Sequence, residues 1–330
     1  MSFAIDHEVE AAKALVWSLW ADVDGVERCA GPRDLSLLAP DVEAWVSAPV
    51  GRLSGAEAVG ASLFEPLLRS FPQLTRRTDV FGGGRFDGGV WVASTGVFRG
   101  QFREDWCTVP AHGGEVDVRF GEFAKVVDER IVEVRILFDV VWVAAQASHE
   151  LLPPFSGRSG TPPPPALANG VSRDAQDPAV SAETLQLIED MLGGCNRLVD
   201  GELRSMGMDA YWHTDMRWYG PHGVGAAHGF DEFGLHAQGP SVASFPNRRG
   251  GFHQARFADG LMGAFTGWPS LQGTFDGVPF RGIEPTGGPI GQNIMDFYVR
   301  RGDLLHENWV LIDLVDFAAQ CGVDLLERFR

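Results

Sequence analysis

Hydrophobic and polar positions follow two periods along the chain, and the elements they predict occur twice in the same order. Apolar residues at helical spacing follow a capping residue, Asp6 in the first half and Ser181 in the second. The inner faces of these two helices are predicted to carry Val9, Ala12, Val16, Leu19 and Val23, and Leu185, Ile188, Leu192, Cys195 and Leu198. Short helices and three or four strands with period two follow each of them. Helices followed by a meandering antiparallel sheet indicate an α+β fold.

An internal repeat accounts for this duplicated order. RIVEVRILFDVVWVAAQ, from Arg130, and LLHENWVLIDLVDFAAQ, from Leu304, lie 174 residues apart and share an aspartate inside an apolar run, Asp139 and Asp313. The segments from Gly55 and Gly229 match at the same separation, and RFDGG matches RFADG. Trp45 aligns with Trp218 if one loop residue is added. The sequence therefore predicts two tandem units.

A linker separates the two copies. Residues 148–180 contain clustered Pro, Gly and Ser without helical or strand periodicity, which is typical of a partly extended connection. The predicted organisation is a first repeat at 1–147, expected to be degenerate, a linker at 148–180, and a second repeat at 181–330 that holds a ligand pocket. The sequence leaves open whether the copies pack within one chain, exchange between chains or form a homodimer.

The turn Arg301-Gly302-Asp303 predicts a hairpin that decides which side chains share a face. With the tip near Gly302, Asp296 is expected opposite Glu307, and both on one face with Trp309 and Asp313. A carboxylate within an apolar run costs free energy unless it is paired, hydrogen-bonded or faces a wet cavity. The predicted face therefore combines three carboxylates and a tryptophan.

Composition and charge exclude several classes of function. The formal charge of −17 and the pI near 4.9 argue against binding of nucleic acid, which needs a basic surface. We expect no membrane span and no signal peptide, and hence a cytoplasmic protein. The four cysteines, Cys29, Cys107, Cys195 and Cys321, are scattered, and neither they nor the histidines have metal-ligand spacing. No metal and no cofactor are expected.

Chemically adaptable side chains concentrate in the second copy, which holds all three tyrosines and six of the nine histidines. His222, His236 and His253 are candidates to position a substrate oxygen or to carry a second proton. Each is also compatible with a structural role. The predicted binding residues are Trp218, Tyr219, His253, Arg256, Trp268, Glu307 and Trp309, with an ion pair as the alternative for Arg256 and the core for Trp268.

A strand of the form E-x-W-x-x-x-D, here Glu307, Trp309 and Asp313, after a helix-first α+β unit resembles the SnoaL-like polyketide cyclases of the nuclear transport factor 2-like superfamily. The preceding Pro-Thr-Gly loop, acidic strand and turn are also similar. The resemblance covers 181–330 well and 1–147 more faintly. It implies a curved antiparallel sheet around helices with a conical pocket, and an aspartate on the last strand, matched by Asp313, as general acid/base without cofactor or metal.

The resemblance implies a cofactor-independent cyclase, isomerase or dehydratase-like lyase acting on a hydrophobic carbonyl-containing small molecule. Asp313 and Asp296, with His222 or His236, are the expected catalytic residues. Burial against tryptophan and nearby like charges would raise the pKa of Asp313. In the alternative interpretations, Asp313 accepts backbone hydrogen bonds at the strand end, the pocket belongs to a non-catalytic binding protein, or the cone is filled by side chains.

Overall fold

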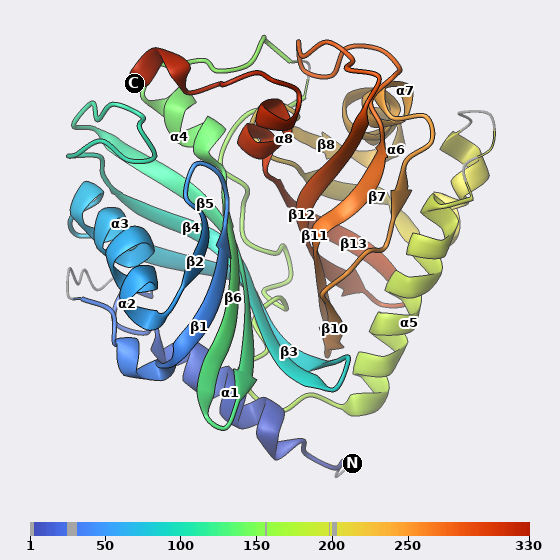
Figure 1. Ribbon diagram of the computed structural model, residues 1–330. Coiled ribbons are helices and arrows are strands. Elements are labelled where there is room, and N and C mark those ends of the chain that lie inside the picture. The colour runs from blue at the N-terminus through green and yellow to red at the C-terminus, as the bar shows by residue number, and fades with distance from the viewer. Residues whose placement is uncertain (1–2, 25–31, 156, 198, 200–202) are drawn as a thin grey trace.

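Two α+β units, each a curved sheet with helices, make up the computed structural model (Figure 1), which describes residues 3–24, 32–155, 157–197, 199 and 203–330. The first unit contains helices α1 (His7–Ser18), α2 (Ala56–Val59), α3 (Glu65–Ser70) and α4 (Val140–Gln146). Its strands are β1 (Leu38–Val46), β2 (Gly51–Ser54), β3 (Thr75–Phe86), β4 (Gly89–Gln101), β5 (Glu115–Val127) and β6 (Arg130–Phe138). Within the described ranges no helix has the length and apolarity needed to span a bilayer.

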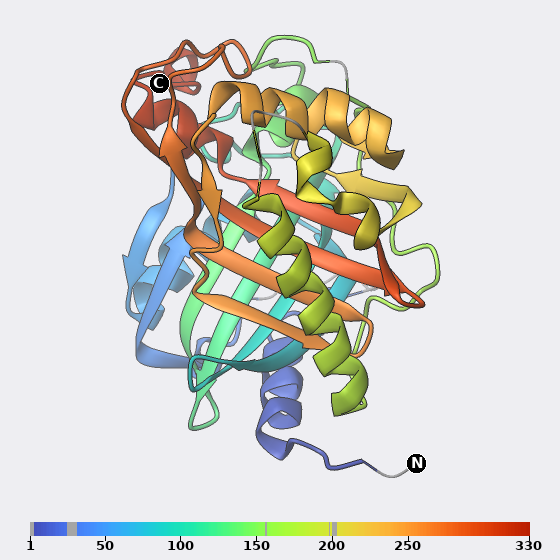
Figure 2. The same cartoon turned by 90° about the vertical axis from the view of Figure 1, so that its right-hand side faces the viewer.

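The second unit repeats this plan. Its helices are α5 (Pro178–Cys195), α6 (Gly229–Phe233), α7 (Gly239–Ser244) and α8 (Leu314–Gln320). Its strands are β7 (Trp212–Tyr219), β8 (Ala226–His228), β9 (Arg249–Gly250), β10 (Ala255–Asp259), β11 (Met262–Thr274), β12 (Pro289–Arg301) and β13 (Leu304–Ile312). Figure 2 shows α5 lying across the strands of the second sheet.

The strand orders of the two sheets are identical. The first runs β2-β1-β6-β5-β4-β3, and the second, with β9 attached to β11, runs β8-β7-β13-β12-β11-β10. Even a π-helical turn recurs at matching positions, Gly60–Phe64 and Gly234–Gln238. The glutamine that ends each matched sequence clamps the edge of an equivalent strand: Gln146 accepts from Asp117 N at 2.9 Å and Gln320 from Gly291 N at 3.0 Å. The predicted fold class, tandem α+β units, is confirmed.

The predicted start of the first helix is correct in the first unit and wrong in the second. Asp6 caps α1 by accepting from Val9 N at 3.3 Å, as predicted. Helix α5 begins earlier than expected, because Asp177, and not Ser181, accepts the capping hydrogen bond. Its buried face carries Thr184, Ile188, Met191 and Gly194, and Leu198 lies outside the described residues.

The two sheets pack against each other within the chain through one hydrophobic cluster. Phe123 of the first sheet meets Phe297 of the second at 5.4 Å between ring centroids. A Cβ at Gly121 would lie 3.0 Å from both Leu311 and Phe297, so a larger residue there would push these side chains apart. The cluster also contains Val80, Trp91, Leu137, Tyr219, Phe257, Met262, Met295, Trp309 and Leu311. Each unit thus buries one sheet face against the other unit and wraps the opposite face around its helices.

The predicted hairpin exists, but the predicted register is wrong. Asp296 pairs with Val310, while Phe297 pairs with Trp309 and Val299 with Glu307. The register shifts between Arg300 and Val299, and the first copy has the same irregularity between Val126 and Lys125. The tight turn and this bulge displace the predicted pairing by an odd number of residues, which moves side chains to the opposite face. Asp296 therefore lies on the other side of the sheet from Glu307 and Trp309.

The strand pairing also corrects the alignment of the copies. Trp45 pairs with Arg135, and Tyr219 pairs with Trp309. Because Arg135 and Trp309 occupy matching positions, the partner of Trp45 in the repeat is Tyr219, and no added loop residue is needed. Trp218 instead matches Ala44.

Candidate functional site

The concave side of the second sheet encloses a cavity of about 180 Å³. Three of the predicted site residues reach it: Asp296 from β12, Trp218 from β7, and His253 from the segment between β9 and β10. Its wall is mainly apolar, with Leu192, Val224, Phe233, Phe265, Leu271, Phe280, Ile294, Val310 and Ile312. The cavity lies in the second copy, within the repeat for which the sequence predicts a pocket.

Asp296 is the carboxylate in this cavity. Tyr298 Oη donates to Asp296 Oδ1 at 3.0 Å, and Asn308 Nδ2 donates to the same oxygen at 3.2 Å. In the described part of the chain no hydrogen bond is made to Oδ2, which remains available to a ligand. Burial raises the pKa of Asp296 to about 7, and the two hydrogen bonds oppose the shift only in part. Near neutral pH this carboxyl can therefore both accept and return a proton.

His253 presents a defined tautomer in the wall of the same cavity. Its ring stacks on Phe265 with 4.1 Å between centroids, and Phe265 pairs with Asp296 across the sheet. His253 Nδ1 lies 3.1 Å from Nη1 of Arg256, and a guanidinium can only donate, so Nδ1 is the acceptor. Burial and the Arg256 charge lower the pKa of His253 to about 3. The ring is thus neutral, with its proton on Nε2, and cannot be the second proton carrier at neutral pH.

The equivalent interior of the first unit is filled by side chains. Glu122 occupies the position of Asp296 in the repeat, but its carboxylate accepts from Trp20 Nε1 at 3.3 Å, Ser94 Oγ at 3.1 Å and Arg76 Nη2 at 3.4 Å. The guanidinium of Arg76 lies 4.6 Å from the ring centroid of Phe120. Trp20 and Phe98 complete the filling. The Glu122 carboxylate is therefore occupied by an ion pair and hydrogen bonds within the protein.

Asp313 lies at the junction of the two units, outside the cavity that Asp296 lines. Its Oδ1 accepts from Asp316 N at 3.0 Å and so caps α8, while its Oδ2 accepts from Ala48 N of the first unit at 2.9 Å. Asp139 makes the matching bonds, from Trp142 N at 3.1 Å and from His222 N at 2.8 Å. Burial raises the pKa of Asp313 to about 7. The geometry favours the structural alternative, and the predicted common face with Asp296 is wrong.

We expect Asp313→Ala to lower the free energy of unfolding by about 1–3 kcal/mol, because it removes a helix cap and the acceptor of a buried N–H group. The measurement is urea unfolding at about pH 5.5, below the raised pKa, so that relief of a buried charge does not mask the loss. Asp139→Ala is the matched comparison, and it should cost more because Arg119 then loses its carboxylate, 3.4 Å away. Unchanged stability in both variants would contradict the capping role.

Four predicted binding residues lie at the interface between the sheets. They do not line the Asp296 cavity of the second unit, which is called the second cone below, or simply the cone. Trp309 Nε1 donates to Pro163 O at 3.2 Å, and Glu307 accepts from Ala166 N at 2.9 Å, so both fasten the linker. Tyr219 packs on Trp309 and donates to Glu307 at 3.4 Å. Trp268 packs against the same cluster. The odd register displacement in the hairpin explains the error for Glu307 and Trp309.

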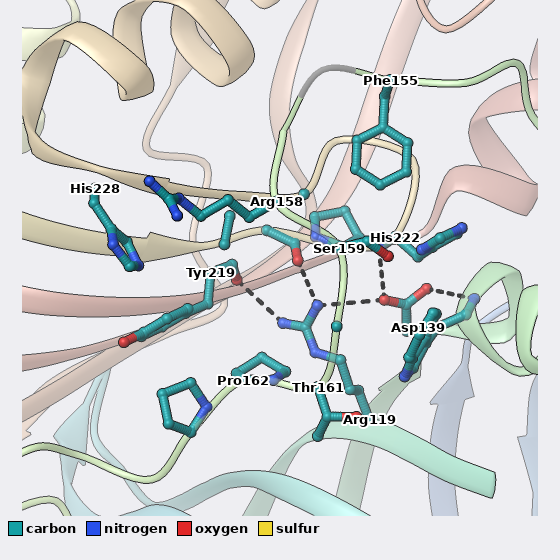
Figure 3. A pocket seen from close by; sticks show the side chains of 17 residues that line it. Arg119, Asp139, Phe155, Arg158, Ser159, Thr161, Pro162, Tyr219, His222 and His228 are labelled. Atoms are coloured by element: carbon teal, nitrogen blue, oxygen red, sulfur yellow. Dashed lines mark hydrogen bonds and ion pairs between the residues drawn. The ribbon is translucent and has the colours of Figure 1, made fainter.

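His222 and Tyr219 help to line a second cavity, of about 160 Å³, between the units (Figure 3). Arg119 dominates this site, and its guanidinium donates to Asp139 Oδ2, to Tyr219 O and Val310 O at 3.1 and 3.3 Å, and to Gly220 O. The His222 ring packs on Trp142 and lies 3.4 Å from Glu150. Arg119 and His222 thus make their polar contacts with other residues of the protein. These contacts hold the two units together and leave few polar groups for a ligand.

The two remaining predicted residues occupy other positions. Arg256 pairs with Glu189 of α5 at 3.0 Å, which is the ion pair foreseen as its alternative, and touches the site only through His253. His236 lies in the π-helical turn Gly234–Gln238 and does not line the cone. Among the described residues no group of three or more His, Cys, Asp or Glu side chains could hold a metal ion.

Several polar residues of the site were not predicted from the sequence, among them Asn308 and Tyr298, which donate to Asp296, and Gln292 and Arg248, which line the cavity. The first three share a feature. They alternate with buried apolar residues on β12 and β13, as Asp296 does. Strict period-two counting outward from Asp296 would have found Gln292 and Tyr298. Predicting Asn308 would have required knowledge of the bulge, and predicting Arg248 would have required the position of the short strand β9.

Comparison with known protein families places the fold. The family model for SnoaL-like polyketide cyclase matches residues 30–147. Residues 30–147 are a SnoaL-like unit. The match falls on the first copy, although the E-x-W-x-x-x-D strand is intact only in the second, where Arg135 is replaced by Trp309. The second copy has the same strand order as the first, so the chain consists of two tandem α+β units.

Solved structures similar to the chain each cover less than half of it. AclR from Streptomyces galilaeus, a proposed hydroxylase, is 17% identical over 43% of this chain and 82% of its own, with a TM-score of 0.35. IdmH from Streptomyces antibioticus, a proposed polyketide cyclase, is 23% identical over 42% and 99%, with a TM-score of 0.34. TsrD from Streptomyces laurentii is 20% identical over 43% and 96%, with a TM-score of 0.35. No functionally curated protein matches the chain.

Proposed function

We propose that this chain is a cofactor-independent acid/base enzyme, a cyclase, isomerase or dehydratase-like lyase, that acts on a hydrophobic carbonyl compound in the second SnoaL-like cone. The observation that carries the proposal is Asp296, a carboxyl without a neighbouring cation, in a mainly apolar cavity, with its pKa raised to about 7. The catalytic assignment thus passes from Asp313 to Asp296.

In the proposed reaction, Oδ2 of ionised Asp296 accepts a proton from the carbon next to the substrate carbonyl, and the bonding electrons move onto the carbonyl oxygen as an enolate. In an isomerisation, the protonated carboxyl returns that proton to a different carbon of the enolate. In a cyclisation, the enolate carbon first attacks a second carbonyl, and the carboxyl then gives its proton to the alkoxide oxygen that forms. Tyr298 and Asn308 fix the carboxylate through Oδ1. The apolar wall favours a hydrophobic substrate. It also keeps the pKa of Asp296 close to the neutral pH at which the base would work.

Exchange of α-protons for deuterium in aryl ketones, followed by NMR, tests the proposal without knowledge of the natural substrate. Because the base must be ionised, we expect exchange to rise with pH and to reach half its maximum near pH 7. Asp313 has a similarly raised pKa, so the midpoint alone does not identify the residue. Asp313→Asn is therefore the control and should keep both the rate and the midpoint.

Two results would argue against the proposal. Loss of exchange in Asp313→Asn, with normal folding, would return the assignment to the junction aspartate. Ligands that bind the wild-type protein but are recovered unexchanged at every pH would identify a carrier that uses the same cone without chemistry.

A further inference from the structure

The cone contains a cation that no carboxylate of the described chain neutralises. Arg248 lines the cavity, and its one hydrogen bond from the guanidinium goes to the hydroxyl of Ser241, 3.3 Å from Nη1. Burial lowers the pKa of Arg248, and the thiol of Cys195 opposes this shift. In a chain of net charge −17, a partly buried arginine without an acidic partner leaves a positive charge for a ligand to compensate.

Gln292 adds an unpaired polar group at the same end of the cavity. Its side chain is 3% exposed, and Nε2 has no hydrogen-bond partner in the described structure. Leu271 pairs with Gly250 on one side and with Gln292 on the other, so these three residues form a row across the sheet. Arg248 precedes Gly250 by two positions. The guanidinium and the amide thus belong to one region of the wall.

His253 provides a second unpaired donor at the Asp296 end. Its Nε2 is buried and without a partner among the described residues, and Arg256 fixes the proton on that atom. A neutral N–H group beside a carboxylate base suits a carbonyl oxygen that becomes negative as the base removes a proton. Gln292 and Asp296 are four residues apart on one strand face, about 13 Å between Cα atoms at ordinary strand rise.

We propose that the ligand of the second cone is an apolar keto carboxylate, whose carboxylate binds Arg248 and Gln292 while its carbonyl oxygen accepts the Nε2 proton of His253 beside Asp296. This inference rests on the proposed function for the orientation of the carbonyl. It adds a specific anionic group to the substrate. It also accounts for the three polar groups that the protein itself leaves without charge or hydrogen-bond compensation.

Equilibrium binding tests the inference independently of turnover. The probes are aryl keto acids of increasing length, beginning with 3-benzoylpropionate, and their methyl esters, titrated calorimetrically into the full chain. We expect the acid of best-fitting length to bind about tenfold or more tightly than its ester. Arg248→Gln should remove this preference, Arg248→Lys should keep part of it, and Arg249→Gln, at the exposed neighbouring arginine, should leave it unchanged.

The other two contacts have separate signatures. His253→Phe, which preserves the stack on Phe265, should weaken the acid and the ester equally, because both retain the ketone. Asp296→Asn should bind the acid at least as tightly as the wild type, even where exchange is lost. Equal affinity for acids and esters, an unaltered preference in Arg248→Gln, or no binding of any keto acid at millimolar concentration would overturn the proposal. A wild-type protein that prefers acids but exchanges no protons would refute the enzymatic function alone.

Discussion

Replacing Asp296 by asparagine is expected to lower α-proton exchange by about 10²- to 10⁴-fold, the usual contribution of a positioned general base. Asparagine has the same shape, and its Oδ1 can still accept from Tyr298 and Asn308, which lie at 3.0 and 3.2 Å from the native oxygen. The cavity should therefore persist, and only the proton acceptor is lost. NMR exchange rates for both proteins at about pH 8 provide the measurement.

The same substitution should stabilise the protein above neutral pH. The folded-state pKa of Asp296, about 7, exceeds the ordinary aspartate value of 3.8, so the folded chain binds this proton more tightly than the unfolded chain does. Stability from this group is fully present below the unfolded pKa and is lost as pH rises through about 7. At about pH 8 the buried carboxylate then costs up to about 4 kcal/mol, which Asp296→Asn relieves.

Urea unfolding of both proteins at about pH 5 and pH 8 separates these effects. The increase in the free energy of unfolding on Asp296→Asn should be clear at the higher pH. It should shrink at the lower pH, where the wild-type carboxyl carries its proton in the folded state. Loss of activity accompanied by loss of stability at pH 8 would instead indicate that Asp296 supports the fold.

Local patterns predicted much of the architecture. The cap at Asp6 and the turn at Gly302 depend on residues close in sequence, and the repeat follows from direct comparison of the two halves. The structure contains all three. The face of the acidic strand depends on one bulge, which no hydrophobic pattern marks because His306 beside it is as buried as its neighbours. That single residue decided whether Asp296 or Trp309 would line the cone.

The recurrence of Asp139 and Asp313 identified an important position without identifying its role. Each aspartate caps its own helix and also accepts an N–H group from the other unit, Ala48 or His222. Ala48 and His222 are themselves 174 residues apart, so the contact is exchanged symmetrically. Sequence periodicity within one unit cannot reveal a partner supplied by the other, and a motif residue expected at the pocket floor is found at the junction.

Glu122→Gln, at the position that matches Asp296, is expected to have the opposite effect on stability. The side chains of Glu122 and Arg76 are each 3% exposed and lie 3.4 Å apart. Removing the carboxylate charge leaves the guanidinium buried without its partner, which typically costs about 3–5 kcal/mol. Burial already lowers the pKa of Arg76, and the Glu122 charge is the largest influence that opposes this shift.

A double-mutant cycle with Arg76→Met isolates the pair from the surrounding packing. Because methionine removes the orphaned cation and fits among Trp20, Phe98 and Phe120, which surround the guanidinium, the double variant should recover most of the stability lost in Glu122→Gln. Exchange activity in the second cone should remain unchanged throughout. A cost below about 1 kcal/mol for Glu122→Gln would show that the ion pair does not stabilise the filled interior of the first unit. If Glu122→Gln and Asp296→Asn changed the free energy of unfolding in the same direction, the distinction between a filled first unit and a working second unit would be lost.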